Sequence, residues 1–317
     1  MEVKFMKFRV LFLKKTHIYL VILILLLIIL FILFITSKAS PTSNTISNNK
    51  NIKADFNGDG KEDILSVTRV DDNYLMEVTI NNKTFSFKTD ENSPIIETYS
   101  PYWPIRVTLM DISRNKVPEI FIQGSKNNKP LQRVFVFHNN NFDNILSNSN
   151  DILGFIDCKN NKTPKVISGK IQGNNIAFSN YIFLNYKFTN YSYDTNKTFI
   201  GKDTIYAFIK LIEGLPESEY YKPNSIFSSD ISKEDMSLIG RLSGEDNSYV
   251  FQDALFKENK CDNKGDISEI CWTLNFRGIS NADNSIVKNY TLDLILTPDK
   301  NSKDNYYFKI ASICKQR

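Results

Sequence analysis

The stretch DFNGDGKEDIL, Asp55–Leu65, carries the most specific chemistry in this sequence. Alternate positions hold oxygen-bearing side chains, two glycines stand between them, and a β-prone apolar run follows at once. Glycine tolerates the left-handed backbone of a tight turn, and a tight loop turns alternate side chains towards a common centre. The pattern predicts a cation site with four candidate side-chain ligands, which are Asp55, Asn57, Asp59 and Asp63.

The ligand type and the spacing select the ion. Hard oxygen donors without His or Cys favour Ca²⁺ over transition metals. Lys61 must point its ammonium away from a cation, so it can offer only its backbone carbonyl. An EF-hand would need Glu at position 12, but Ser66 stands there inside the apolar run. The loop therefore precedes a strand, and the alternative interpretation is a solvated turn rich in Asp and Asn.

From Ile52 onward the chain consists of short β-prone runs separated by turns rich in Asn, Asp and Gly. Alternating apolar residues and the enrichment in β-branched and aromatic side chains favour antiparallel strands. The sequences INNKTF and FHNNNF are typical of hairpin turns. The clearest predicted strands are DILSVTRV (63–70), YLMEVTI (74–80), EIFIQG (119–124) and RVFVFH (133–138).

The opening motif recurs twice in degenerate form, as DISRNKVPEIF from Asp111 and as DCKNNKTPKVI from Asp157. The copies start at residues 55, 111 and 157, a spacing of roughly 50 residues, which is about the size of one four-stranded propeller blade. The second copy lacks glycine, and the third places Lys159 and Lys165 at ligand positions, where cations oppose metal binding. One Ca²⁺ site is therefore expected, in the first copy.

The pattern D-x-N-x-D-G-x-x-D followed by a hydrophobic strand resembles the calcium loop of FG-GAP (VCBS-type) repeats, which occur in integrin-like β-propellers. The resemblance covers roughly residues 52–198. It implies a structural Ca²⁺ held by the four side chains named above and by the carbonyl of Lys61. A closed single-chain propeller needs at least four blades. Three repeats either form an open or atypical β structure or are completed by strands from elsewhere.

After Gly201 the pattern changes. The segment DTIYAFIKLIEGL has apolar residues at helical spacing, with Asp203 as the expected N-cap and Gly214 as the stop. A second short helix is predicted within residues 228–244, and four long β runs follow. Helices followed by a series of strands indicate an α+β domain.

The order of elements in residues 201–317 resembles the NTF2-like cone, whose curved sheet surrounds a pocket. Two interpretations of its aromatic residues stay open: they line such a pocket, or they form the sheet core. These residues are Trp272, Phe276, Tyr290 and Tyr307.

The N-terminal region carries an uninterrupted apolar run, Ile18–Ile35. At 1.5 Å per residue it extends about 27 Å, close to the ~30 Å hydrocarbon core of a bilayer. Basic residues precede it, which predicts a cytoplasmic tail at 1–16, a transmembrane helix at 17–36 and an extracytoplasmic remainder. A cleaved signal peptide, with secretion of the rest, is the alternative. Residues 37–51 are rich in Ser and Asn and are expected to be a flexible linker.

The net charge of +4 comes entirely from the first sixteen residues, where five cations face Glu2. The body is neutral, which argues against nucleic-acid binding. Of the four cysteines, Cys261 and Cys271 flank a polar turn and could form a disulfide; four reduced thiols are the alternative.

The predicted fold is mainly β, with propeller-blade-like antiparallel repeats over 52–200 and an α+β domain over 201–317, behind one transmembrane helix. The predicted function is a membrane-anchored extracytoplasmic binding or scaffold protein with an unidentified protein or carbohydrate partner. With two histidines and no nucleophile elbow, phosphate loop or HExxH, no catalytic residue is predicted. The alternative is a cell-envelope hydrolase that uses an acidic pocket in the C-terminal domain.

Overall fold

The computed structural model describes nine stretches of the chain: residues 15–36, 42–46, 50–87, 89, 95–158, 164–190, 199–221, 223–300 and 306–316. The chain divides into two units, Met1–Ser40 and Pro41–Arg317. Each unit is described by itself.

The first unit contains the helix α1, Lys15–Thr36, over the segment predicted to be helical. Its side chains are described for residues 15–17 and 19–28, and the large apolar side chains from Tyr19 to Ile28 are exposed. Within the part of the chain that the structure describes, no helix has the length and apolarity needed to span a membrane.

The second unit begins with two antiparallel sheets. The first sheet is a meander of β2 to β5, with β6 paired to β4. Its strands are β2 (Lys50–Ala54), β3 (Asp63–Val70), β4 (Asn73–Ile80), β5 (Lys83–Ser86) and β6 (Ile95–Thr98). The second sheet has the order β1-β7-β8-β9-β10. Its strands are β1 (Thr42–Ile46), β7 (Ile105–Met110), β8 (Glu119–Lys126), β9 (Lys129–His138) and β10 (Asn141–Asn148).

Strand β1 differs from the expectation for residues 37–51. Composition favours a flexible linker there, but the backbone of β1 pairs with β7 from Thr42↔Leu109 to Ile46↔Ile105. Without β1, β7 would be an edge strand with unpaired backbone groups, so a polar segment nearby can pair with it regardless of its own low β-propensity.

The third sheet joins the two parts that were predicted as separate domains. Its order is β14-β13-β12-β11-β15-β16-β17-β18, and β11 pairs in parallel with β15, with Ile152 opposite Ala254. The repeats therefore do not close into a propeller, and a strand from the C-terminal region extends the third one. The strands are β11 (Ile152–Ile156), β12 (Lys165–Gln172), β13 (Asn175–Leu184), β14 (Lys187–Asn190), β15 (Asn247–Cys261), β16 (Ile267–Ser280), β17 (Val287–Pro298) and β18 (Phe308–Lys315).

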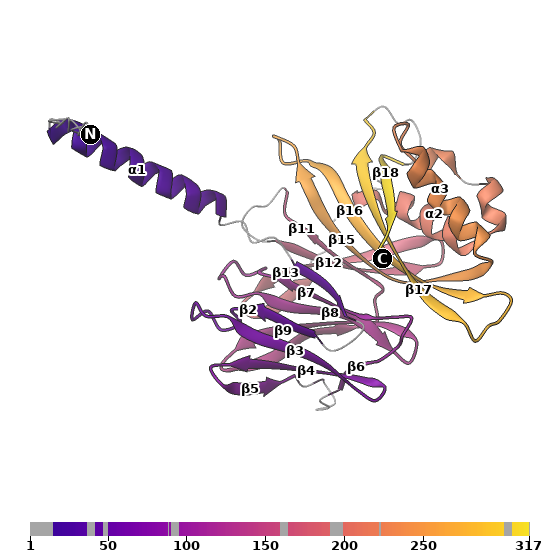
Figure 1. Ribbon diagram of the computed structural model, residues 1–317, viewed down its shortest axis with the longest axis horizontal. Coiled ribbons are helices and arrows are strands. Elements are labelled where there is room, and N and C mark those ends of the chain that lie inside the picture. The colour runs from indigo at the N-terminus through magenta and orange to yellow at the C-terminus, as the bar shows by residue number, and fades with distance from the viewer. Residues whose placement is uncertain are drawn as a thin grey trace, which may run out of the picture. The chain divides into compact units, whose positions relative to one another are not determined.

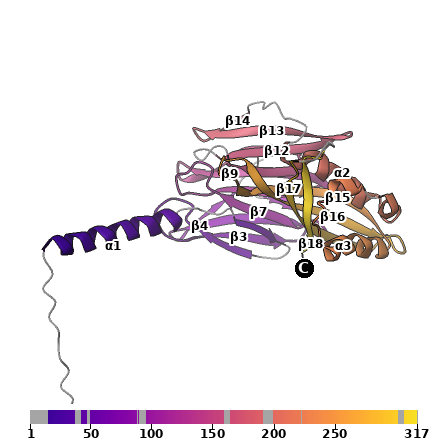
Figure 2. The same ribbon diagram turned by 90° about the horizontal axis from the view of Figure 1, so that it is seen from above.

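Three hydrophobic clusters hold these layers together. One contains side chains of the first and second sheets, such as Val78 and Ile120. Another contains side chains of the second and third sheets, such as Phe121 and Phe155. The third packs the third sheet against two helices, which Figure 1 shows next to β18. Figure 2 shows β12, β13 and β14 next to one another, as their pairing requires.

Helix α2 spans Lys202–Glu213 and helix α3 spans Lys233–Gly244. The N-cap of α2 is Gly201, with a φ of 75°, and not Asp203, which lies in the first helical turn. The stop at Gly214 is as predicted. Three 3₁₀ turns flank the helices, at Phe199–Gly201, Glu217–Tyr221 and Asn224–Ile226.

Of the four aromatic residues named for the C-terminal region, three form the core of its sheet, and Tyr307 is partly buried against that core. Trp272, Phe276 and Tyr290 are each at most 2% exposed and belong to the cluster that packs against the helices. Trp272 stacks on Phe256 with ring centroids 4.5 Å apart.

The predicted Cys261–Cys271 disulfide is wrong. Cys261 is bonded to Cys158, while Cys271 and Cys314 are free thiols. In the register of β15 and β16, Cys271 lies opposite Lys257, several residues along the strand from Cys261. The two cysteines are close in sequence but do not face each other.

Candidate metal centre

The three copies of the opening motif form equivalent loops, each joining the first two strands of a meander. They connect β2 to β3, β7 to β8 and β11 to β12. In each copy, position 9 is the first residue of the second strand, and these residues are Asp63, Glu119 and Lys165. The repeat found in the sequence is therefore a repeat in the structure.

Asp55 organises the first loop. Its Oδ1 accepts a hydrogen bond from the Gly58 N–H at 2.7 Å, and its Oδ2 accepts one from the Gly60 N–H at 2.8 Å. Both glycines have positive φ, 79° and 83°. The backbone therefore curls around the carboxylate at position 1, in a conformation that glycine adopts with little strain.

Asp59 lies at the exposed side of this loop. Its Oδ1 accepts the Lys61 N–H at 2.9 Å, and its Oδ2 accepts the side-chain amides of Asn81 at 2.9 Å and Asn57 at 3.1 Å. These hydrogen bonds, that from Asn81 first, lower the pKa of Asp59. The side chain is therefore an ionised carboxylate, as a calcium ligand must be. Asn81, in the turn after β4, was not predicted from the motif because it lies outside it.

Asp63 is the buried member of the set. Its side chain is 3% exposed and accepts the Phe56 N–H at 2.9 Å. Burial raises its pKa, and the negative charges of Asp59 and Asp55 raise it further. The negative charges of Asp55 and Asp59 thus act on the buried Asp63 carboxylate, and a bound cation would offset them.

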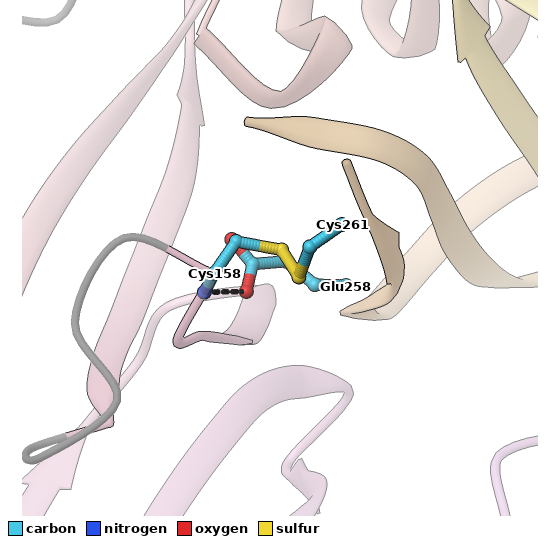
Figure 3. A group of neighbouring side chains, drawn as sticks. All are labelled: Cys158, Glu258 and Cys261. Atoms are coloured by element: carbon cyan, nitrogen blue, oxygen red, sulfur yellow. Dashed lines mark hydrogen bonds between the residues drawn. A yellow bond between two sulfur atoms is a disulfide. The ribbon is translucent and has the colours of Figure 1, made fainter. Parts of the chain in front are cut away.

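The donor chemistry of the loop fits a hard cation, although its carboxylates point to the loop's own amides. Among the described residues, one set of three Cys, Asp or Glu side chains brings ligand atoms within 4.8 Å of one another, and it lies elsewhere, at Cys158, Glu258 and Cys261. In that set the two sulfurs are bonded to each other, as Figure 3 shows.

The second loop has the same backbone course without glycine. Arg114 and Lys116 occupy the positions of Gly58 and Gly60, and they too have positive φ, 57° and 71°. Asp111 accepts the Lys116 N–H at 2.9 Å, and Glu119 accepts the Ile112 N–H at 2.8 Å. The second loop thus carries two cationic side chains at the positions that glycine occupies in the first loop.

In the third loop, the buried carboxylate comes from another strand. Position 9 is Lys165, but Glu258 of β15 accepts the Asp157 N–H at 2.5 Å and the Cys158 N–H at 2.6 Å. Figure 3 shows Glu258 beside the disulfide. Glu258 therefore makes the contact that Asp63 and Glu119 make in the other loops. The local motif could not reveal it, because it lies about a hundred residues away.

The first carboxylate of the third loop forms an ion pair with an arginine of the second loop. Arg114 of the second loop contacts Asp157 with an N–O distance of 2.5 Å. The guanidinium thus gives Asp157 a positive partner within the protein. Residues 159–163, including the predicted unfavourable Lys159, lie outside the described residues.

Residues 55–122 match the family model of the FG-GAP-like repeat. The matched segment includes the first and second loops, so this part of the chain contains an FG-GAP-like repeat. The repeat indicates an extracellular binding or scaffold role. No curated protein and no solved structure matches the chain significantly. The NTF2-like resemblance of residues 201–317 stays a prediction.

Proposed function

We propose that this protein is a membrane-anchored, extracytoplasmic binding or scaffold protein whose first repeat loop holds one structural Ca²⁺ ion. The observation that supports the calcium site is one loop with three carboxylates, in which Asp55 and Asp59 place negative charge near the buried Asp63 and hydrogen bonds keep Asp59 ionised. The ion would be held by Asp55, Asn57, Asp59, Asp63 and the carbonyl of Lys61.

The role of the ion would be structural. The loop joins β2 to β3, and Asp63 is the first residue of β3. Bound Ca²⁺ would offset the repulsion among the carboxylates and fix the connection between the two strands. Extracellular calcium modules commonly have a Kd of about 10⁻⁴–10⁻³ M, so millimolar calcium outside the cell would occupy much of the site.

The test is thermal unfolding in calcium and in chelator. Ca²⁺ at ten times its Kd should stabilise the fold by roughly 1.4 kcal/mol, which is a rise of a few degrees in Tm. Mg²⁺ should do less, because it demands stricter octahedral geometry. Asp59→Ala should abolish the rise, whereas the matched change Asp111→Ala in the second loop should leave most of it. Identical melting of the wild type in calcium and chelator would overturn the proposal.

The membrane anchor rests on the sequence. The apolar run Ile18–Ile35 follows a basic tail, and the apolar side chains described within α1 are exposed. Protease added to intact cells should therefore digest the second unit and spare the tail. Protection of the second unit would reverse the orientation, and its release into the medium would indicate a cleaved signal peptide.

A further inference from the structure

An open cleft of about 490 Å³ lies between the tips of two β-hairpins. One hairpin joins β9 to β10, and the other joins β13 to β14. We call it the hairpin cleft. It is lined by His138, Asp143, Asn144, Ile145, Asn185, Tyr186, Lys187 and Phe188.

The backbone at Tyr186 departs from the rule that the other hairpins follow. Three hairpin turns in the described chain have positive φ at two successive residues, and in each both are Asn: 81–82, 127–128 and 139–140. The fourth is Asn185–Tyr186, with φ of 51° and 58°. Asn tolerates this region, whereas a bulky side chain there is strained. A strained residue in an otherwise regular turn points to a role for its side chain.

The strained turn places the Tyr186 ring against His138. The two rings stack with centroids 4.0 Å apart and an interplanar angle of 29°. Tyr186 is 44% exposed, so a large part of the ring remains accessible to a ligand. Asp143 contacts the same imidazole, with Oδ2 3.6 Å from Nδ1. The result is an accessible aromatic surface with a carboxylate beside it.

We propose that the hairpin cleft binds a neutral pyranose sugar of an extracellular glycan. The C–H face of the sugar ring would pack on Tyr186, and its hydroxyls would bond to the carboxylate of Asp143 and the amide of Asn185. Ligand sites commonly combine an aromatic or apolar surface with a few placed polar groups. One acid, Asp143, and one cation, Lys187, flank the cleft, which favours a neutral ligand over an ion. This inference rests on the proposed extracellular binding function and names its ligand class.

The two histidines provide the readout. Full-length protein labelled with ¹³C-histidine gives one signal from His138 and one from His17. Glucose, galactose, mannose and N-acetylglucosamine are titrated separately, each in calcium. At least one should shift the His138 signal saturably and leave His17 unchanged, because a sugar on Tyr186 alters the environment of the stacked imidazole.

Two variants test the aromatic surface. Tyr186→Phe keeps the ring and should keep most of the binding. Tyr186→Asn restores the residue of the other turns; it should weaken binding at least tenfold while leaving Tm unchanged or higher. Equal sugar affinity in Tyr186→Asn, or a lower Tm in that variant, would overturn the proposal, as would a His138 signal that no hexose moves. If Ca²⁺ still raises Tm in that last case, the sugar inference fails while the calcium loop stands.

Discussion

Charge balance, more than glycine, distinguishes the three loops. The second loop reaches the backbone course of the first with Arg114 and Lys116 at the two glycine positions. In the third loop, Asp157 forms an ion pair with Arg114 of the second loop, and position 9 is Lys165. Where the loops carry their own cations, carboxylate repulsion is offset from within the protein. The first loop keeps its excess of negative charge, and this is the physical basis for predicting a metal there.

The motif predicted the position of the first loop from residues 55–63 alone, while the metal in that loop stays a prediction. It could do so because the loop binds its own backbone, and the spacing of Asp55 and Gly58 fixes those contacts. Asn81 and Glu258 could not be predicted, because each reaches its loop from another part of the chain.

The buried position-9 acid of the second loop should make stability depend on pH. Burial raises the pKa of Glu119 from 4.5 to about 7. Below pH 4.5, both folded and unfolded chains are protonated there. Between pH 4.5 and 7, the unfolded chain ionises first, so the free energy of unfolding falls as pH rises. Above pH 7 both chains are ionised at this residue, so its contribution to the free energy of unfolding no longer changes with pH.

Glu119→Gln removes this ionisation and keeps an oxygen for the Ile112 N–H. The free energy of unfolding of the variant should match that of the wild type near pH 4 and exceed it at pH 8 by about 3 kcal/mol. Urea unfolding in chelator at both pH values measures this difference. A stability difference that is the same at pH 4 and pH 8 would contradict the assignment.

At the scale of elements, local patterns were predicted well and distant pairings were not. Strand β3 spans Asp63–Val70, as its alternation indicates, and the Asn81–Asn82 turn follows from its sequence. The pairing of β1 with β7 and of β11 with β15 has no local signal. Partners far apart in sequence are chosen by the packing of layers, which periodicity within one strand does not encode.

The Cys158–Cys261 bond should stabilise the junction of the third loop with β15. Its residues are separated by 103 positions, and closing so long a loop restricts the unfolded chain strongly. The double change Cys158→Ser, Cys261→Ser should cost about 2–4 kcal/mol in urea unfolding. Cys314→Ser, at an exposed free thiol, is the matched control and should change little. A control as unstable as the double variant would contradict the assigned role.

Across the whole second unit, buried polar contacts connect the second and third sheets. Asp253 of β15 is 2% exposed and accepts from Arg106 at 2.9 Å and from the Trp103 indole at 2.5 Å. Because a buried arginine without its acid is costly, Asp253→Ala should destabilise the unit by roughly 3–5 kcal/mol. The contact therefore couples the repeats to the C-terminal strands.

Residues 41–317 should consequently unfold in one calorimetric transition. A fragment ending at residue 200 should fail to fold, because it loses β15, the Asp253 anchor and Glu258. Circular dichroism and calorimetry of residues 41–317 and of the shorter fragment measure this. Two separate transitions, or a fragment with a cooperative melt of its own, would show that the shared sheet does not couple the two regions.

The central claim is that Ca²⁺ binds the first loop, and glycine amide signals test it most directly. The chain has twelve glycines, so ¹⁵N-glycine labelling gives a simple spectrum. Gly58 and Gly60 donate to Asp55, and their signals should shift saturably as Ca²⁺ is added. The Gly173 signal, from a turn of the third sheet, should not shift. In Asp59→Ala, Ca²⁺ should no longer shift the Gly58 and Gly60 signals. If Gly58 and Gly60 do not move in millimolar Ca²⁺, the loop is a polar turn and not a metal site.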